Sequence, residues 1–193
     1  MPGDDDRWRM RVLGAADVDA LQRFFAANPE YFQTVNGEPP RADEAAHELA
    51  DVPPAGMPYR EMVLVGFAGD DAPAELVGMA SVVSDLIAAH VWHIGLFIVA
   101  SGLHGSGAAQ AMYRALERWM RESGAEWIRL GVVAGNAKAE RFWERAGYVQ
   151  VRERGPLPMG RKTNLLRVLV KPLGTGSVAS YLDLVSRDRP GAP

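Results

Sequence analysis

The chain has 193 residues, enough for one domain with a buried core, and its 48% hydrophobic and 23% charged residues are typical of a globular protein. It contains no cysteine, which excludes disulfides, a cysteine-based zinc site and a thiol nucleophile. A formal net charge of -3 gives no general attraction to nucleic acid.

The first half of the chain predicts one strand, two helices and then three strands. Residues 8–13 alternate in the manner of a half-buried strand, and Asp17 can cap a helix that continues to about Asn28. Prolines and an Asn-Gly pair favour a loop or broken helix over 28–41, before a second helix over 44–50. An antiparallel meander of three strands joined by short links is predicted over 62–68, 75–84 and 90–99.

The second half of the chain alternates between helices and strands. An apolar face with helical spacing predicts a helix over 105–122, and an apolar run predicts a central, buried strand over 126–133. A further helix over 136–146 precedes two final strands, 148–153 and 164–171. This order of elements predicts an α/β (α+β) architecture with a mixed sheet.

Composition also sets expectations for domains, location and partners. We expect residues 1–172 to form one domain and the Gly-, Ser- and Pro-containing segment 173–193 to form a mobile tail. The N-terminus is acidic where a signal peptide would be basic, and no apolar run has the length of a transmembrane helix. The histidines include no His-x-x-x-His pair with a nearby Glu. We therefore expect a cytoplasmic protein with no membrane, no nucleic-acid partner and no metal.

The Gly-rich turn within residues 98–109 is the stretch with the clearest chemistry. A strand ends, several glycines follow, and a helix begins near Gly105. Because glycine has no side chain, successive backbone N–H groups can point outward, and the first N–H groups of a helix have no partner inside it. With the helix dipole they form an anion site suited to a pyrophosphate. A plain strand-to-helix connection is the alternative, whereas a dinucleotide-binding fingerprint is disfavoured because Gln110 replaces its third glycine.

Two blocks of the sequence resemble the GNAT superfamily of N-acetyltransferases. The family's cofactor motif, Val-x-Pro-x-x-Arg-Gly-x-Gly-x-Gly/Ala, is matched by Val99, Ser101, His104, Gly105, Gly107 and Ala109. The second block, Asn-x-x-Ala-x-x-Phe-Tyr-x-x-x-Gly-Phe, is matched by Asn136, Ala139, Phe142, Trp143, Gly147 and Tyr148. The resemblance covers roughly residues 62–153. The departures from the family pattern are His104 for Arg or Gln, Ser101 for Pro, and Trp143 for Tyr.

This resemblance implies a fold, an activity and a cofactor. The fold would be a GNAT-like mixed, largely antiparallel twisted sheet of about seven strands flanked by about four helices. The activity would be transfer of an acetyl group from acetyl-CoA to a primary amine of a small molecule or peptide by direct attack, and the family allows a homodimer. The residues implied to bind acetyl-CoA are Phe97, Ile98, Val99, His104, Gly105, Ser106, Gly107, Ala108, Ala109, Asn136, Ala139, Phe142 and Trp143.

The general base has two candidates. His93 matches the position where many relatives carry a Glu that acts as general base, and a His there is chemically competent. A structural His bonded across the sheet is the alternative. Asp85, near the end of the preceding strand, is the competing base, although it also suits a turn. Strict alternation along the strand would place His93 on the same face as Phe97 and Val99.

Further expectations concern the acceptor pocket and the leaving group. Tyr31 and Phe32 lie in the region that lines the acceptor pocket in the family, although simple packing would explain them equally well. Trp143 replaces the Tyr that usually acts as general acid, and an indole N–H is not a usable acid near neutral pH. Tyr148 aligns with an apolar Phe, so we expect it to point into the core. The resemblance therefore implies catalysis without a side-chain general acid.

Two other classes of function remain open on the sequence alone. A regulatory protein of the same fold could bind acyl-CoA without turnover. A protein-interaction domain could contain the same turn and bind no cofactor. Release of CoA in the presence of an amine distinguishes an enzyme from the first, and a thermal shift with CoA distinguishes a cofactor-binding protein from the second.

Overall fold

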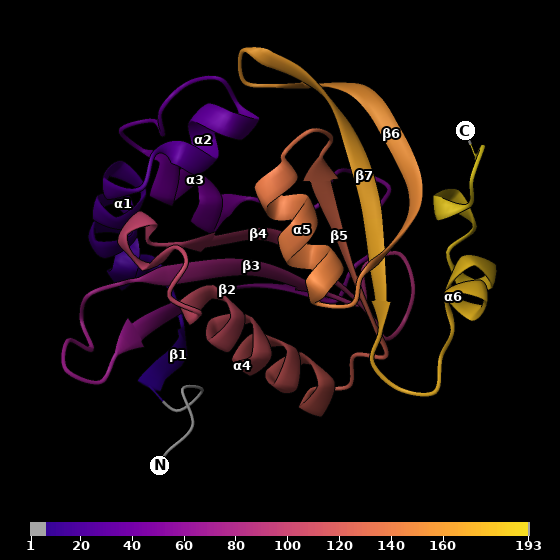
Figure 1. Cartoon of the computed structure of the whole chain (residues 1–193), viewed down its shortest axis with the longest axis horizontal. Helices are drawn as coiled ribbons and strands as arrows, with labels where there is room; N and C mark the ends of the chain where they lie inside the picture. Colours follow the sequence, from indigo (N-terminus) through magenta and orange to yellow (C-terminus); the bar gives the residue numbers. More distant parts are fainter. Residues whose placement is uncertain (1–6, 193) are drawn as a thin grey trace.

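A single seven-stranded sheet forms the centre of the molecule (Figure 1). The computed structural model describes residues 7–192, so residues 1–6 of the predicted domain and residue 193 of the predicted tail lie outside the described residues. The sheet order is β1-β2-β3-β4-β5-β7-β6, and only β4 and β5 are parallel neighbours. The strands are β1 (Trp8–Val12), β2 (Glu61–Gly69), β3 (Gly78–Ser84), β4 (Val91–Val99), β5 (Trp127–Val133), β6 (Val149–Met159) and β7 (Lys162–Pro172). The predicted mixed, largely antiparallel sheet is confirmed.

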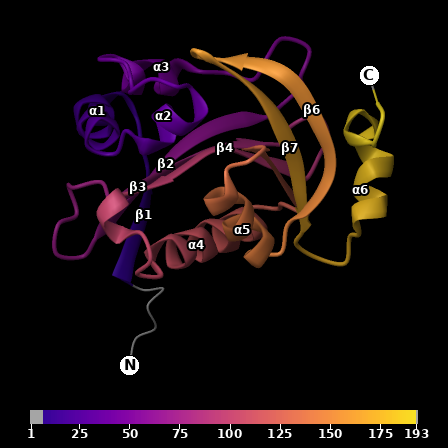
Figure 2. The same cartoon turned by 45° about the horizontal axis from the view of Figure 1, so that its top comes forward.

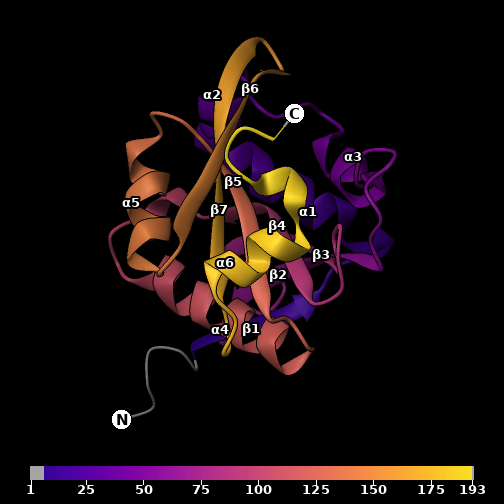
Figure 3. The same cartoon turned by 90° about the vertical axis from the view of Figure 1, so that its right-hand side faces the viewer.

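Helices cover both faces of this sheet. Helices α1–α3 lie on one face and α4 and α5 on the other (Figure 2). Helix α6 packs over β5 and β7, on the same face as α1–α3 (Figure 3). The helices are α1 (Val18–Ala27), α2 (Glu30–Val35), α3 (Glu44–Ala50), α4 (Ala108–Glu122), α5 (Ala137–Arg145) and α6 (Val178–Leu184), with 3₁₀ turns η2 (Ala15–Asp17), η3 (Ser101–Leu103) and η4 (Ser186–Asp188). None of the helices in residues 7–192 has the length and apolar character needed to cross a membrane.

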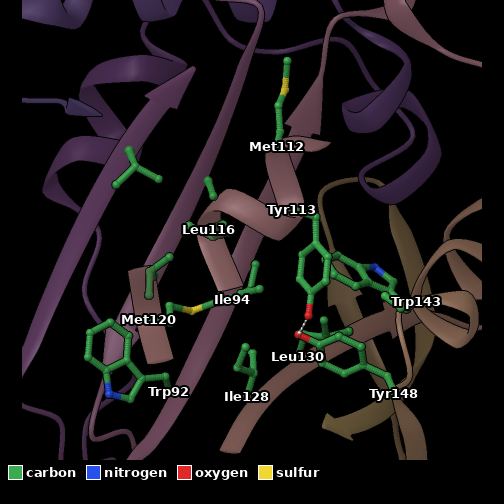
Figure 4. Close-up of a cluster of buried hydrophobic side chains, with 14 of the residues drawn as sticks. Trp92, Ile94, Met112, Tyr113, Leu116, Met120, Ile128, Leu130, Trp143 and Tyr148 are labelled. Atoms are coloured by element: carbon green, nitrogen blue, oxygen red, sulfur yellow. Dashed lines mark hydrogen bonds between the residues drawn. The ribbon is translucent and has the colours of Figure 1, made fainter. Parts of the chain in front are cut away.

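The main core lies between the sheet and α4 (Figure 4). Met112, Leu116 and Met120 recur every four residues along α4, so they share one face of the helix, and all three are fully buried. They pack on apolar side chains of the central strands, among them Ile94, Ile128 and Leu130. Full burial of such a side chain contributes about 1.5–3 kcal/mol. This packing fixes α4, and with it the Gly-rich turn from which α4 begins.

Strand β4 contains a β-bulge at Gly95. Ile94 pairs with Val82 of β3 and Leu96 pairs with the adjacent Ser81, so Gly95 is an extra residue in β4. One extra residue reverses the alternation of side chains along the remainder of a strand. The two halves of β4 therefore present odd-numbered residues to opposite faces of the sheet.

The bulge overturns one prediction about β4. Strict alternation placed His93 on the same face as Phe97 and Val99, and this is wrong. Phe97 and Val99 pack in the core beneath α4 and α5. His93 lies on the opposite face, where it contacts Arg129. The physical reason is the extra residue at Gly95, which changes the register without changing the apolar composition of the strand.

Residues 173–192, which the sequence placed in a tail, pack against the sheet as α6 and η4. Tyr181 and Asp188 are fully buried. Arg129 of β5 donates from Nε to Asp188 at 2.7 Å, and the Tyr181 hydroxyl donates to the same carboxylate at 2.6 Å. Arg152 of β6 also donates to the carbonyls of Arg187 and Ala192. The side chains of Arg129 and Arg152 therefore attach this segment to β5 and β6.

Candidate functional site

The two central strands separate and leave an opening in the sheet. Strands β4 and β5 pair only as far as Ile94 and Leu130. The next residue on each strand is a glycine, and both Gly95 and Gly131 are exposed although they lie in the middle of the sheet. Beyond them, the edge of β4 that faces β5 has no partner strand in the described part of the chain. Its backbone groups are available to a ligand placed between the strands.

A cleft of about 600 Å³ extends along this opening. Its walls come from the region joining α1 and α2, the end of β4, the turn before α4, and α5. A volume of this size is typical of small-molecule sites. The predicted residues that line it are Tyr31, Phe97, Ile98, Val99, His104, Gly105, Gly107, Ala109, Asn136, Ala139, Phe142 and Trp143.

The predicted residues outside the cleft lining are Phe32, Asp85, His93, Ser106 and Ala108. The hydroxyl of Ser106 donates to the Leu103 carbonyl at 2.7 Å and accepts from the N–H of Ala108 at 3.3 Å. Ser106 therefore shapes the turn from within. Phe32 is buried against Phe25, with ring centroids 5.1 Å apart. It packs in the core beneath α1, which is the plain alternative that the sequence left open.

The turn before α4 presents free backbone donors. Gly105 and Gly107 have φ angles of 81° and 88°, and a Cβ atom at either would meet no atom within 4 Å. Within residues 7–192, the N–H groups of Gly105, Gly107 and Ala109 have no hydrogen-bond acceptor. They lie at the N-terminus of the 15-residue helix α4, whose dipole favours negative charge. The turn therefore fits an anionic group such as a pyrophosphate.

His104 connects this turn to α5. Its Nε2 lies 3.0 Å from the Val99 carbonyl oxygen, and its Nδ1 lies 2.6 Å from Nζ of Lys138. A carbonyl only accepts and an ammonium only donates, so the geometry corresponds to a neutral ring with its proton on Nε2. Both ring nitrogens are thus engaged within the protein. Through this contact His104 holds the ammonium of Lys138 beside the turn.

The cleft has a basic wall on α5 that was not predicted from the sequence. Lys138, Arg141 and Arg145 are exposed on α5, and all three line the cleft. Their spacing of three and four residues places them on one face of the helix. That spacing, in a helix beginning at Asn136, is a signal that the sequence contained. These cations add to the attraction that the turn exerts on an anionic ligand.

The aromatic side of the cleft belongs to α5 and β4. Phe97 stacks on Phe142 with ring centroids 5.9 Å apart, and Trp143 packs against both rings. Tyr148 lies in the core, as expected, where its hydroxyl accepts from that of Tyr113 at 3.1 Å. Burial raises the pKa of both phenols. Neither tyrosine is therefore placed or tuned to donate a proton into the cleft.

His93 is half-buried and lies away from the cleft. Burial, assisted by the nearby Arg129 guanidinium, lowers the pKa of His93 to about 3. Nη1 of Arg129 lies 3.3 Å from its Nδ1, and Arg129 is itself held by Asp188. A group with so low a pKa is a weak base at neutral pH. The structure thus favours the structural alternative for His93.

Asp85 belongs to the turn between β3 and β4. Its Oδ1 accepts a hydrogen bond from the N–H of His90 at 2.7 Å. Its φ of 52° is a left-handed conformation that Asp adopts more readily than most residues. This carboxylate closes the turn and does not line the cleft.

Glu48 is a titratable group that the sequence did not reveal. Burial raises the pKa of its carboxyl to about 7; a hydrogen bond with Ser81 opposes the rise, and the nearby Asp51 and Glu44 add to it. Glu48 also acts on Tyr31, a residue of the cleft wall, whose pKa is raised chiefly by burial.

The hairpin formed by β6 and β7 leans over α2 (Figure 1). Nζ of Lys162 donates to the carbonyls of Gln33 and Thr34 at 3.1 and 2.8 Å. Asn164 donates from Nδ2 to the Val35 carbonyl at 2.8 Å. Because Thr34 lines the cleft, these contacts fix one wall of the site from the far end of the sheet.

Three proteins of known structure illustrate the likeness of this fold to solved structures. A ribosomal-protein-S5-alanine acetyltransferase from Vibrio fischeri has a TM-score of 0.66 and 13% identity, over 89% of this chain and 96% of that chain. A spermidine N-acetyltransferase chimera from Vibrio cholerae and hSSAT has a TM-score of 0.65 and 14% identity, over 92% and 99%. NAA60 of Arabidopsis thaliana, in complex with acetyl-CoA, has a TM-score of 0.60 and 12% identity, over 86% and 98%. At these identities the likeness shows the fold alone.

No curated protein sequence matches the chain significantly. The model of the acetyltransferase (GNAT) family matches residues 22–148. That segment is more than half of the chain and runs from α1 to the end of α5, so it includes both sequence blocks and most of the cleft. The chain therefore belongs to the GNAT family of acetyltransferases.

Proposed function

We propose that this acetyltransferase moves the acetyl group of acetyl-CoA to a primary amine, which attacks the thioester directly. The observation that carries the proposal is the row of free N–H donors at Gly105, Gly107 and Ala109, set beside the opening between β4 and β5. The donors suit the pyrophosphate of CoA. The unpaired edge of β4 suits the amide groups of its pantetheine arm, and the opening leads that arm toward the centre of the sheet.

The basic residues of α5 support the same ligand. CoA carries several phosphate charges, and Lys138, Arg141 and Arg145 form an exposed cationic wall next to the turn. Such charges raise the local concentration of an anionic ligand and accelerate its binding. The backbone donors supply the geometry, whereas the side chains supply charge.

Direct attack requires a neutral amine. An alkyl amine has a pKa of about 10.4, and removing its proton at pH 7 costs about 4–5 kcal/mol. Releasing a thiolate from a group with a pKa of about 8.5 costs only about 2 kcal/mol. A base is therefore worth more than an acid in this reaction. The burial of Tyr148 in the core agrees with catalysis that has no side-chain general acid.

The cofactor assignment is tested by the variant Gly107→Glu. A carboxylate at this position would stand where phosphate binds, so we expect acetyl-CoA affinity to fall more than about 100-fold, or about 2.7 kcal/mol, in calorimetry. Gly107→Ala imposes a similar positive-φ strain without the charge, and Gly102→Glu places the charge elsewhere on the same loop. Both controls should bind far better. Undiminished affinity of Gly107→Glu, with an unchanged circular dichroism spectrum, would remove the turn from the site.

The catalytic assignment is tested by release of CoA from acetyl-CoA in the presence of amines. A panel containing spermidine, amino acids and an alanine-starting peptide samples both small-molecule and peptide acceptors. We expect at least one amine to release CoA and to gain an acetyl group, detected by mass spectrometry. Tight binding of acetyl-CoA with no release for any amine would instead support the non-catalytic, acyl-CoA-binding alternative.

A further inference from the structure

Helix α2 is too short to be stable by itself. It has six residues, and isolated helices of fewer than about 12 residues are marginal in water. Its order must therefore come from contacts with other elements. Phe32 and Val35 are buried, and the carbonyls at its C-terminal end accept hydrogen bonds from Lys162 and Asn164 of the β6–β7 hairpin. The N-terminal end of α2 has a separate attachment to the Gly-rich turn before α4.

Ser101 makes this second attachment. Its hydroxyl donates to the Glu30 carboxylate at 2.5 Å, and its N–H donates to Oδ1 of Asn28 at 2.7 Å. Asn28 is only 7% exposed and donates from Nδ2 to the Phe24 carbonyl at 2.8 Å, which orients its amide oxygen toward Ser101. Ser101, Asn28 and Glu30 all line the cleft. One residue therefore bonds to both ends of the short link between α1 and α2.

Ser101 belongs to the same hydrogen-bonded stretch as the free backbone donors. Its carbonyl accepts from the N–H of His104 at 3.1 Å, and the Leu103 carbonyl accepts from the N–H of Ser106 at 3.3 Å. Between His104 and Ser106 lies Gly105, whose N–H has no acceptor in the described part of the chain. A ligand that binds the free donors therefore restrains the backbone to which α2 is attached.

Both bonds depend on a serine at this position. The GNAT motif has a proline here, and proline has neither an N–H nor a hydroxyl group. The backbone itself suits proline, because Ala100 has a ψ of 132°, in the extended range of a residue before proline, and Ser101 is the first residue of η3. The proline ring would, however, meet the Asn28 oxygen that accepts from the Ser101 N–H. The serine therefore adds the attachment to α2 without changing the path of the turn.

We propose that Ser101 is a positioning residue that couples the two sides of the cleft: acetyl-CoA on the Gly-rich turn orders α2, and the ordered helix binds the amine more tightly. This rests on the proposed function. No chemical step passes through Ser101, which acts by holding the cleft-lining residues Tyr31 and Thr34 of α2 in place. The first ligand to bind orders the helix, so the second binds to a wall that is already ordered. Such coupling is reciprocal, and the amine should raise the affinity for acetyl-CoA by the same factor.

Hydrogen exchange of the α2 amides tests the coupling before any amine is identified. In the wild-type protein we expect saturating CoA to slow this exchange about five-fold or more, the lower end of typical coupling between sites. The double variant Asn28→Ala/Ser101→Pro removes the N–H together with its acceptor, and removes the hydroxyl as well. Its CoA affinity by calorimetry should stay within about the same five-fold factor of wild type. Exchange in α2, however, should no longer respond to CoA.

Two single variants define the contribution of each bond. Ser101→Ala keeps the bond to Asn28 and loses the bond to Glu30, so it should show a smaller response to CoA than the wild-type protein. Gly102→Ala is the matched control on the neighbouring residue, where a Cβ atom would meet no atom within 4 Å. It should respond to CoA as the wild type does.

Kinetics with the amine that the panel identifies provide a readout that a loss of stability would not change. In the double variant the KM of the amine should rise about five-fold while kcat stays near that of the wild type. A merely destabilised enzyme would instead lose kcat, because fewer molecules are folded, and would keep its KM.

The proposal is overturned if bound CoA leaves exchange in α2 of the wild-type protein unchanged, or if the double variant keeps the full response. Should circular dichroism show that the double variant is unfolded, Ser101→Ala decides, and an undiminished response in it overturns the proposal. Failure of the wild-type protein to bind CoA in calorimetry is a different result: the proposed function then fails, and the coupling fails with it.

Discussion

Glu48 opposes folding whenever it is ionised. Its pKa in the folded protein is about 7, above the ordinary value of 4.5. Below about pH 4 the carboxyl is protonated in both states and carries no penalty. As the pH rises through 7, the folded state must hold a buried charge that the unfolded state leaves in water. The stability associated with this group is therefore present at low pH and lost at high pH.

Replacing Glu48 by Gln should therefore stabilise the protein at alkaline pH. At pH 8 we expect the free energy of unfolding to rise by on the order of 2 kcal/mol, because one pKa unit corresponds to about 1.4 kcal/mol. The gain should disappear by pH 4. Urea unfolding of wild type and variant at both pH values measures the difference. A variant that is less stable at pH 8 would show that the carboxylate has a counter-ion.

Local sequence motifs predicted one part of the cleft wall, whereas features that depend on long-range contacts could not be predicted. The glycine turn at Gly105 and Gly107, which lines the cleft, was predictable because it depends on the backbone of one short stretch. The burial of His93 depends on Arg129 and on Asp188, which follows 95 residues later in the sequence numbering. Glu48 draws its character from Ser81 of another element. No pattern within a single segment contains these relations.

At the level of elements, periodicity predicted most of the fold. The helix at Glu44–Ala50 has the predicted bounds, and the other early elements differ by a few residues at their ends. Strand β6 was predicted to end at residue 153 but continues to Met159. Pro156 and Pro158 lie in the added stretch, and the structure accommodates them through a register shift between Arg154 and Leu157. Helix α6 was not predicted because it is short. Its apolar residues are buried only by packing against β5 and β7, which the local sequence does not indicate.

The attachment of the C-terminal segment depends on the buried pair of Arg129 and Asp188. Removing one member of such a pair leaves the other charge buried without a partner. We expect Asp188→Ala to lower the free energy of unfolding by about 3–5 kcal/mol in urea titrations. Asp183→Ala breaks an exposed ion pair with Arg189 in the same segment and should cost less than about 1 kcal/mol. Equal effects of the two variants would contradict this account.

Across the whole molecule, the hairpin of β6 and β7 holds the wall of the cleft that α2 provides. Lys162→Met removes both bonds to the carbonyls of Gln33 and Thr34. We expect the KM of the amine to rise several-fold, acetyl-CoA affinity to stay constant, and hydrogen exchange in α2 to accelerate. Arg161→Met, which breaks an exposed pair with Glu38 at the same tip, is the matched control. Unchanged exchange in α2 would show that the hairpin does not restrain it.

The same hairpin also sets an order of events during synthesis of the chain. Lys162 follows Gln33 by 129 residues. Ribosomes add about 5–20 residues per second, so roughly 6–26 s pass between the emergence of α2 and that of its anchor. The Gly-rich turn and α4 are complete well before that moment. A nascent chain that stops short of Lys162 can therefore contain the Gly-rich turn while the opposite wall of the cleft still lacks its anchor, so the wall formed by α2 is completed last.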